Sequence, residues 1–430
     1  MSSPLPPALR LYRLGLIALE PAAGALLRRR VRQGKEDPAR LPERRGFPSR
    51  ERPAGRLAWL HGASIGETLS LMAVVEHLIR EDMSVLVTSG TRTAAELVAR
   101  RLPPGAVHQF VPLDSPRYVR RFLDHWRPDL TLVAESEIWP NTIVELDRRR
   151  IPLVLVNGRM SERSFRRWSR VPQIARALMG RFALCLAQSP ADAERLFGLG
   201  AERVEVAGNL KFDASPPPAD PRALAHLSGL LSGRPVWLAA STHPGEEEIA
   251  VAVHQALAGA FRGLLTIVVP RHPERGGEVA ALARAAGLEA AQRSRDGEPG
   301  RGTELYVADT VGELGLFYRL SPLVFVGGSL VRHGGQNPIE PGKLGAAILH
   351  GPHVHNFADV YAALDGAGGA LPVSDGADLA RAVAECLADV GRMRDMARSA
   401  AGTVEGLGGA LARTVQAIEP FISGVRAEAG

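Results

Sequence analysis

Residues 322–356, PLVFVGGSLVRHGGQNPIEPGKLGAAILHGPHVHN, decide the fold of this chain. The stretch opens with an apolar, β-branched run at residues 323–326, which predicts a buried strand. Two glycine pairs follow that run, and a second apolar run occupies residues 346–349. Two short buried strands joined through a glycine-rich loop and a helix are typical of a parallel α/β sheet.

The segment Asn337-Pro338-Ile339-Glu340 between the two runs has the residue order of a helix start. Asn337 is expected to cap the helix, Pro338 to take its first position, and Glu340 lies three residues after the cap. A glycine loop before a helix N-terminus favours an anion, because free backbone N–H groups and the helix dipole point toward it. An ordinary crossover whose glycines serve only as turns is the alternative that this pattern leaves open.

The composition is that of a globular protein. The chain has 430 residues, enough for two domains, and its 45% hydrophobic and 23% charged residues exclude a disordered protein. Two cysteines give no disulfide framework and no metal-ligand spacing, so a reducing, cytoplasmic setting is expected. The histidines near residue 350 also lack the spacing of a metal site, and no metal is predicted. The net charge of +6 favours an anionic partner.

The basic residues are concentrated near the N-terminus. Residues 28–56 contain eleven arginines and lysines against four acidic residues. Residues 9–27 are apolar, but charged residues and a proline make the run too broken for a membrane-spanning helix, which needs ~20 apolar residues. We expect residues 1–56 to lie on an anionic membrane surface. A solvated basic arm is the alternative, and nucleic acid is disfavoured because aromatic residues do not alternate with the arginines.

Short apolar runs alternate with helical stretches along the rest of the chain, which predicts parallel sheets with ligands at the carboxyl ends of the strands. A triple proline at residues 216–218 is expected to link two domains, residues 57–214 and 219–430, with the last helices packing back on the first domain. We predict an α/β fold of two Rossmann-like domains that face each other across a cleft. The expected strands lie at residues 57–60, 85–87, 130–134, 153–156, 204–207, 236–240, 264–269 and 305–307.

Polar residues that follow these strands are the candidates for chemistry. Glu67 is suited to be a general base or, equally, a first-turn helix acid. Glu135 and Glu137 alternate at the end of a strand and are expected to point to opposite faces. Lys211 and Arg271 follow other strands, where a cation is suited to a carboxylate or phosphate. No GxGxxG and no GxxxxGK[ST] motif occurs, which disfavours a dinucleotide dehydrogenase and a P-loop NTPase.

Nine motifs together resemble those of the 3-deoxy-D-manno-octulosonic acid (Kdo) transferase family, in the family's order and over nearly the whole chain. They are WLHGASIGET (59–68), TSGTRTAAE (88–96), ESEIWPN (135–141), VNGRMSERSFRRW (156–168), GNLKFD (208–213), STHPGEEE (241–248), PRHPER (270–275), DTVGEL (309–314) and GGSLVRHGGQNPIEP (327–341). The resemblance implies the glycosyltransferase-B (GT-B) fold, CMP-Kdo as donor, a lipid A precursor as acceptor and no cofactor. It also implies N-terminal association with the cytoplasmic face of the inner membrane.

The resemblance further implies roles for single residues. The family's general base corresponds to Glu67, while Glu137 and Lys211 correspond to positions that support the transition state. This sequence departs from the family at Gln336, where histidine is commoner, and at Gly62, where alanine is commoner. Glutamine can also donate a hydrogen bond, so the donor site still matches. Contacts to CMP correspond to Pro270, Arg271, Gly312, Glu313, Leu314, Asn337, Pro338, Ile339 and Glu340.

The expected function is inverting transfer of Kdo from CMP-Kdo to a lipid A precursor (lipid IVA), a step of lipopolysaccharide core biosynthesis. Two alternatives remain at this point. A nucleotide-sugar 2-epimerase of the same fold would convert its donor without an acceptor. A non-enzymatic membrane-surface protein would bind the sugar and release no CMP.

Overall fold

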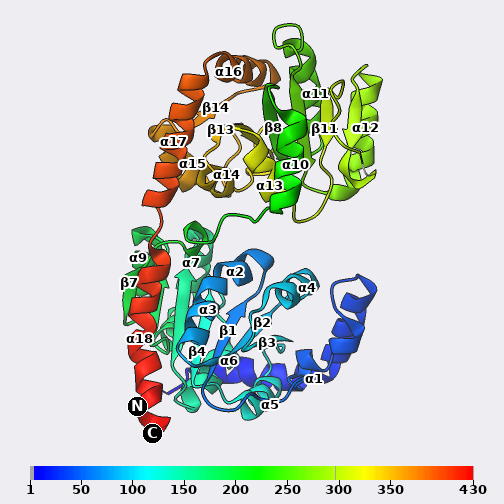
Figure 1. Ribbon diagram of the computed structural model, residues 1–430. Helices are drawn as coiled ribbons and strands as arrows, with labels where there is room; N and C mark the ends of the chain where they lie inside the picture. Colours follow the sequence, from blue (N-terminus) through cyan, green and yellow to red (C-terminus); the bar gives the residue numbers. More distant parts are fainter. Residues whose placement is uncertain (1–3, 296, 430) are drawn as a thin grey trace. The chain divides into compact units, whose positions relative to one another are not determined.

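The computed structural model describes residues 4–295 and 297–429, and the chain forms two compact units (Figure 1). Unit 1 consists of Met1–Ala214 and Gly408–Gly430, and unit 2 of Ser215–Leu407. Each unit is built on one parallel sheet covered by helices. The predicted fold class, two Rossmann-like α/β sheets, is therefore confirmed.

The sheet of unit 1 has seven parallel strands in the order β3-β2-β1-β4-β5-β6-β7. Its central strands are short apolar runs with every residue buried, as a parallel sheet covered on both faces requires. The sequence analysis did not predict β3 or β6. β3 contains the polar residues His108 and Gln109, whereas β6 is a buried apolar run like the strands that were predicted. The strands are β1 Leu57–Gly62, β2 Ser84–Ser89, β3 Ala106–Phe110, β4 Leu130–Ala134, β5 Leu153–Gly158, β6 Leu184–Ala187 and β7 Val204–Val206.

Two hydrophobic clusters form the core of unit 1. One contains Trp59 and Phe122, whose ring centroids lie 4.7 Å apart, and the other contains Leu78 with Ile418 and Ile422 of the last helix. That helix therefore belongs to the core of unit 1, although it follows unit 2 in the sequence. The helices are α1 Pro7–Arg32, α2 Ile65–Ser70, α3 Met72–Arg80, α4 Arg92–Arg101, α5 Pro116–Trp126, α6 Pro140–Arg148, α7 Glu162–Ser169, α8 Pro172–Met179, α9 Pro190–Gly198 and α18 Ala410–Ala429, with short 3₁₀ turns η1 Pro38–Arg40, η2 Glu43–Arg45 and η3 Leu210–Phe212.

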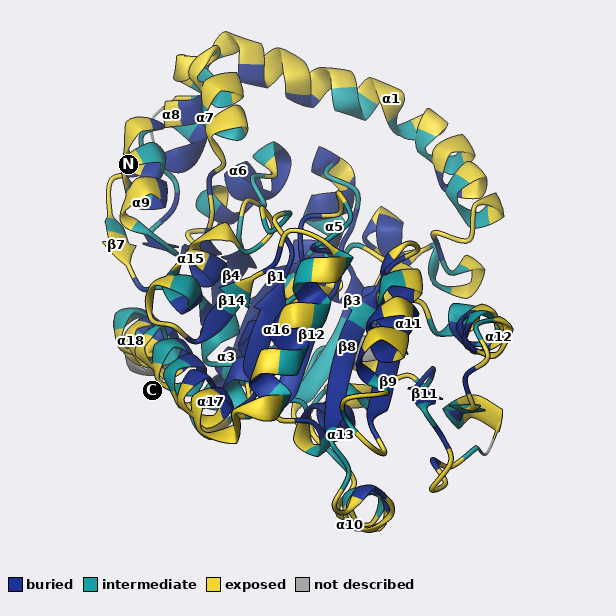
Figure 2. Cartoon of the chain, turned by 90° about the horizontal axis from the view of Figure 1, so that it is seen from above, coloured by how far each residue is buried: buried dark blue, intermediate teal, exposed yellow. Residues whose placement is uncertain are grey.

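Helix α1 contacts the rest of unit 1 through a narrow face and leaves most of its surface exposed (Figure 2). Leu9, Arg13 and Leu27 are its buried residues. Among the described residues, none of the helices combines the length and the apolar character needed to cross a membrane. The leucines that α1 exposes are Leu11, Leu14, Leu19 and Leu26.

The sheet of unit 2 repeats the arrangement with seven parallel strands in the order β10-β11-β9-β8-β12-β13-β14. The strands are β8 Val236–Thr242, β9 Leu265–Pro270, β10 Ala290–Gln292, β11 Leu305–Val307, β12 Leu323–Val326, β13 Ala347–His350 and β14 Ala370–Pro372. The helices are α10 Pro221–Leu231, α11 Glu246–Leu257, α12 Gly276–Ala285, α13 Leu314–Leu320, α14 Ile339–Lys343, α15 Ala358–Gly366, α16 Gly376–Ala388 and α17 Val390–Gly406, with 3₁₀ turns η4 Pro273–Arg275 and η5 Arg293–Arg295.

The stretch from residue 322 to residue 356 forms β12, a glycine loop, α14 and β13 in the predicted order. Strand β12 has the predicted limits, whereas α14 begins at Ile339, so Pro338 is the N-cap rather than the first helical residue. The side chain of Asn337 still accepts a hydrogen bond, at 3.0 Å, from the backbone N–H of Ile339. The capping function of Asn337 is thus kept, but one position earlier than predicted.

Both sheets reverse their strand order at one point, between β1 and β4 in unit 1 and between β8 and β12 in unit 2. At such a point the connections run to opposite sides of the sheet and leave a crevice beyond the carboxyl ends of the two strands. Ligands of open α/β sheets bind in this crevice. A ligand site is therefore expected among the loops that follow these four strands.

Candidate functional site

Glu67 lies in the first turn of α2, beyond the carboxyl end of β1. Ser64 caps this helix, and its hydroxyl donates a hydrogen bond of 2.7 Å to Glu67 Oε1. The backbone N–H of Ala63 donates to Glu67 Oε2 at 2.8 Å. These two hydrogen bonds fix the carboxylate, and each of its oxygens keeps capacity to accept one further proton donor.

Glu137 lies beyond the end of β4, on the other side of the same switch point. Its Oε2 accepts a hydrogen bond from the indole N–H of Trp139 and lies 3.5 Å from Nε2 of the buried His61. The other nitrogen of His61, Nδ1, lies 2.9 Å from the hydroxyl of Thr88. The sequence reasoning did not single out His61, and the strand pairing of β1 with β4 is what brings it to Glu137.

Lys211 joins the same group of side chains in unit 1. Its Nζ forms an ion pair of 2.8 Å with Glu135 Oε1. A Cβ added at Gly66, next to Glu67, would lie 3.9 Å from Lys211 Cε, which places the lysine beside the first turn of α2. Glu135 has a φ of 56°, a left-handed conformation that is unfavourable for glutamate and is typical of functional sites. The three predicted catalytic residues thus gather at one edge of the unit 1 sheet.

In unit 2, Pro270 ends β9 and Arg271 follows it. The backbone N–H of Arg271 donates to Thr242 O at 2.9 Å, and this bond fixes the direction in which the chain leaves the strand. The Arg271 side chain is exposed and forms no ion pair within the described part of the chain. It is therefore a free cation at the carboxyl edge of the sheet, as the sequence predicts.

Gly312, Glu313 and Leu314 lie directly before and at the start of α13. Gly312 has a φ of 89°, which a side chain would strain. Glu313 accepts two hydrogen bonds from Arg293, of 2.8 and 3.1 Å, and these bonds hold the pKa of its carboxyl below the ordinary value. Its carboxylate is therefore engaged within unit 2.

The glycine loop after β12 differs from the predicted anion site. Glu246, at the start of α11 and 1% exposed, accepts hydrogen bonds from the backbone N–H groups of Gly328, Ser329 and Leu330 at 2.7–3.0 Å. A fourth comes from the N–H of His243 at 3.0 Å. The prediction that the loop's N–H groups are free is wrong for these three residues, because a carboxylate of the protein itself already fills the place of an anion.

The chain is similar in sequence to proteins of one family. Residues 39–214 match the family model described as 3-Deoxy-D-manno-octulosonic-acid transferase (kdotransferase). A Bordetella pertussis protein named 3-deoxy-D-manno-octulosonic acid transferase is 34% identical, with 96% of this chain and 99% of the relative covered. A Haemophilus influenzae protein of the same name is 34% identical over 89% of this chain and 91% of its own length. The chain belongs to the Kdo transferase family.

This Kdo transferase is thus a glycosyltransferase, and its fold occurs in other sugar-nucleotide enzymes. A UDP-GlcNAc 2-epimerase from Neisseria meningitidis, bound to UDP-GlcNAc, aligns over 85% of this chain and 100% of its own, with a TM-score of 0.57 and 14% identity. A glycosyltransferase from Rickettsia africae aligns over 86% of this chain and 99% of its own, with a TM-score of 0.57 and 12% identity. These likenesses concern the GT-B fold alone.

His61 and Glu246 lie within the motifs WLHGASIGET and STHPGEEE, but the sequence does not indicate which groups they contact. Glu246 resembles any acidic residue in a first helical turn, and His61 resembles a core histidine at the end of a strand. Both act on partners more than 70 residues away in the chain, since Glu246 bonds to Gly328 and His61 lies beside Glu137. Sequence spacing cannot reveal such contacts, whereas the strand order can.

Proposed function

We propose that this Kdo transferase transfers Kdo from CMP-Kdo to a sugar hydroxyl of a lipid A precursor, lipid IVA, with inversion at the anomeric carbon. The observation that carries the proposal is the carboxylate of Glu67, which hydrogen bonds from Ala63 and Ser64 fix at the switch point of unit 1, close to Lys211. The names of the relatives specify Kdo as the transferred group, which supports this part of the proposal, and the donor and the acceptor are those that the family resemblance implies.

In the proposed mechanism Glu67 accepts the proton of the attacking acceptor hydroxyl. Its two oxygens each accept one hydrogen bond in the structure, so either can take a proton without losing its support from Ala63 or Ser64. General-base assistance of this kind typically contributes ~10²–10⁴ in rate. Glu137 is proposed to stabilise the positive charge that develops on the sugar, and Lys211 the negative charge that develops on the phosphate of the departing CMP.

Unit 2 is proposed to hold the CMP part of the donor. Arg271 is the exposed cation suited to the phosphate of CMP, whose negative charge grows as the bond to the sugar breaks. Because Glu246 occupies three loop N–H groups, the loop is proposed to act as a rigid frame, and Asn337 and Glu340 are proposed to contact the nucleotide. The carboxylate of Glu313 is bound to Arg293, so its contact with CMP is proposed to be through the backbone.

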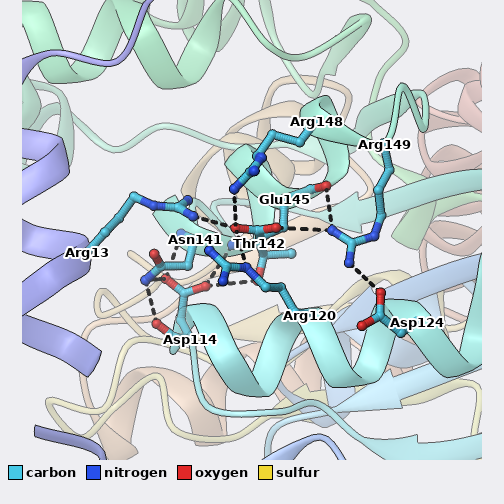
Figure 3. A network of polar contacts seen from close by, with 9 residues as sticks. All are labelled: Arg13, Asp114, Arg120, Asp124, Asn141, Thr142, Glu145, Arg148 and Arg149. Atoms are coloured by element: carbon cyan, nitrogen blue, oxygen red, sulfur yellow. Dashed lines mark hydrogen bonds and ion pairs between the residues drawn. The ribbon is translucent and has the colours of Figure 1, made fainter. Parts of the chain in front are cut away.

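Helix α1 is proposed to hold the enzyme at the cytoplasmic face of the inner membrane. It exposes leucines along its length and ends in arginines, a combination that binds anionic bilayer surfaces. Figure 3 shows how α1 is attached: Arg13 reaches Glu145 of α6, which Arg120 and Arg149 also contact. These contacts fix the rotation of α1 and therefore which leucines face outward.

The proposed function is tested by measuring CMP release from CMP-Kdo with and without lipid IVA. The transferase requires the acceptor; acceptor-independent conversion of the donor would indicate an epimerase, and binding without CMP release would indicate a sugar-binding protein. Glu67→Gln should lower turnover by at least ~10² and leave CMP-Kdo binding intact. The matched control is Glu96→Gln, an exposed helical glutamate of unit 1, which should turn over as the unaltered protein does. Retained turnover in Glu67→Gln would remove Glu67 from its role.

A further inference from the structure

Three histidines that no part of the proposed mechanism uses lie together in unit 2. The rings of His243 and His333 are stacked, with centroids 3.9 Å apart and planes at 27°. The ring of His272 approaches His243 edge-on at a centroid distance of 6.0 Å. They follow β8, β12 and β9, so they occupy the carboxyl edge of the sheet at its switch point. Within the described residues, no group of His, Cys, Asp and Glu has the arrangement needed to hold a metal ion.

The orientation and the tautomer of His243 are fixed by its neighbours. His243 is 6% exposed, and its Nε2 lies 3.0 Å from Nε2 of Gln336. The amide nitrogen of glutamine can only donate, so Nε2 of the neutral imidazole accepts and the ring proton resides on Nδ1. Gly328 allows this contact, because a Cβ there would lie 3.3 Å from the His243 ring and 3.4 Å from the Gln336 amide.

His243 is held in its neutral form as a hydrogen-bond donor. Burial, together with the nearby His333, His272, Arg271 and Arg275, lowers its pKa to about 4. Its Nδ1 has no hydrogen-bond partner within the described residues. The buried carboxylates close to it are already engaged, since Glu246 binds backbone N–H groups and Glu247 lies 3.5 Å from Arg275.

The local charge favours an anion at this position. Arg271 is exposed and unpaired within the described part of the chain, and it is near enough to His243 to influence its titration. A free N–H donor beside an unpaired guanidinium is the arrangement that binds a carboxylate or a phosphate oxygen. The proposed donor carries two such groups, the phosphate of CMP and the carboxylate of an octulosonic acid.

We propose that His243, oriented by Gln336, binds the carboxylate of the acidic sugar in the donor, and that Arg271 lies between this carboxylate and the CMP phosphate. The inference rests on the proposed function, of which it specifies the sugar-recognition residue. The site thereby distinguishes a nucleotide-linked sugar acid from a neutral sugar, because a hydroxymethyl group in place of the carboxylate would leave the Nδ1 proton and the cation without a charged acceptor.

The experiment compares the KM for CMP-Kdo with the inhibition constant of CMP alone, in the full-length protein with lipid IVA as acceptor. His243→Ala should raise the KM for CMP-Kdo by about tenfold or more, since it removes a hydrogen bond to a charged group, and should change the inhibition constant of CMP by less than about twofold. Gln336→Leu keeps the imidazole of His243 but removes the hydrogen bond that determines its tautomer. This variant should raise the KM for CMP-Kdo by a smaller factor. His226→Ala, at an exposed histidine of the same unit, is the control and should change neither value.

An equal rise of both constants in His243→Ala would show that the phosphate is the group contacted, and would overturn the proposal. An unchanged KM in both variants would also overturn it. If His243→Ala fails to fold, Gln336→Leu decides between these outcomes. Failure of the proposed function is separate, because it would appear as the absence of acceptor-dependent CMP release in the unaltered protein.

Discussion

Removing the charge of Glu145 should destabilise unit 1 far more than removing any exposed carboxylate. Glu145 is 1% exposed and lies within 3.6 Å of arginines from three helices, among them Arg13, which is 8% exposed. Glu145→Gln keeps the shape and leaves the guanidinium of Arg13 buried without a counter-charge. Breaking a buried pair in this way costs about 3–5 kcal/mol, which for a unit of this size lowers the Tm by about 6–20 °C.

The pH dependence of the same variant provides the sharper test. Burial raises the pKa of Glu145, but the hydrogen bond from Arg13 and the charges of Arg120 and Arg13 outweigh it, so the pKa lies below its ordinary value. A carboxyl with a lowered pKa stabilises the fold above the pKa of the unfolded chain and loses that contribution as the pH falls through the folded pKa. The difference in the free energy of unfolding between the unaltered protein and Glu145→Gln should therefore have its largest value at pH 7 and decrease as the pH falls.

The assay is urea unfolding followed by circular dichroism at several pH values between 3 and 7. The control is Glu162→Gln, whose side chain is 63% exposed in a helical i,i+4 pair with Arg166, and which should cost less than about 0.5 kcal/mol at every pH. A loss in Glu145→Gln no larger than that of the control would refute the reasoning. A large loss of stability that does not depend on pH would refute the electrostatic explanation and would indicate that Glu145 acts through packing.

Three further predictions concern two substitutions and the reactivity of the cysteines. Glu246→Gln should lower the stability of unit 2 by about 2–4 kcal/mol, seen in urea unfolding, because four backbone N–H groups lose a charged acceptor. Gly276→Ala should yield little folded protein in a solubility assay, since its Cβ would lie 2.0 Å from a carboxylate oxygen of Asp309; normal yield would contradict this packing. Neither cysteine should react with a thiol reagent at pH 8 in the folded protein, because burial raises the pKa of Cys185 to about 12 and that of Cys386 above its ordinary value; rapid labelling before unfolding would be inconsistent with both.

The strands of both sheets could be predicted wherever a short apolar run is buried on two faces. β1, β4, β8 and β12 were found in this way, since each is continuous in apolar residues. Strand β3 lies at the edge of the sheet, where polar residues are tolerated. It was not predicted because its sequence AVHQF has polar residues in its centre. Burial alone does not decide the outcome, because the fully buried β6 was missed and the largely exposed β7 was predicted.

The positions of several candidate residues at strand ends could be predicted from the sequence, whereas their roles stay predictions. Glu67, Glu137 and Lys211 all lie at one edge of the unit 1 sheet, as strand ends require. Glu135 and Glu137 were expected to alternate as strand residues, but β4 ends at Ala134 and Glu135 has a left-handed backbone conformation. The two carboxylates have separate partners, Lys211 and Trp139. The occupation of the glycine loop by Glu246 could not be foreseen, because a loop N–H group looks free until the helix that supplies its acceptor has been positioned.

The placement of α18 in the core of unit 1 has a consequence for biosynthesis. Unit 2 is an uninterrupted segment, Ser215–Leu407, whereas unit 1 is completed only by residues that follow it. On the ribosome, unit 2 can therefore fold completely while unit 1 still exposes the apolar surface that Ile418 and Ile422 will cover. Unit 1 therefore stays incomplete until the last segment is translated, and a ribosome-associated chaperone is expected to remain bound to unit 1 after unit 2 has folded.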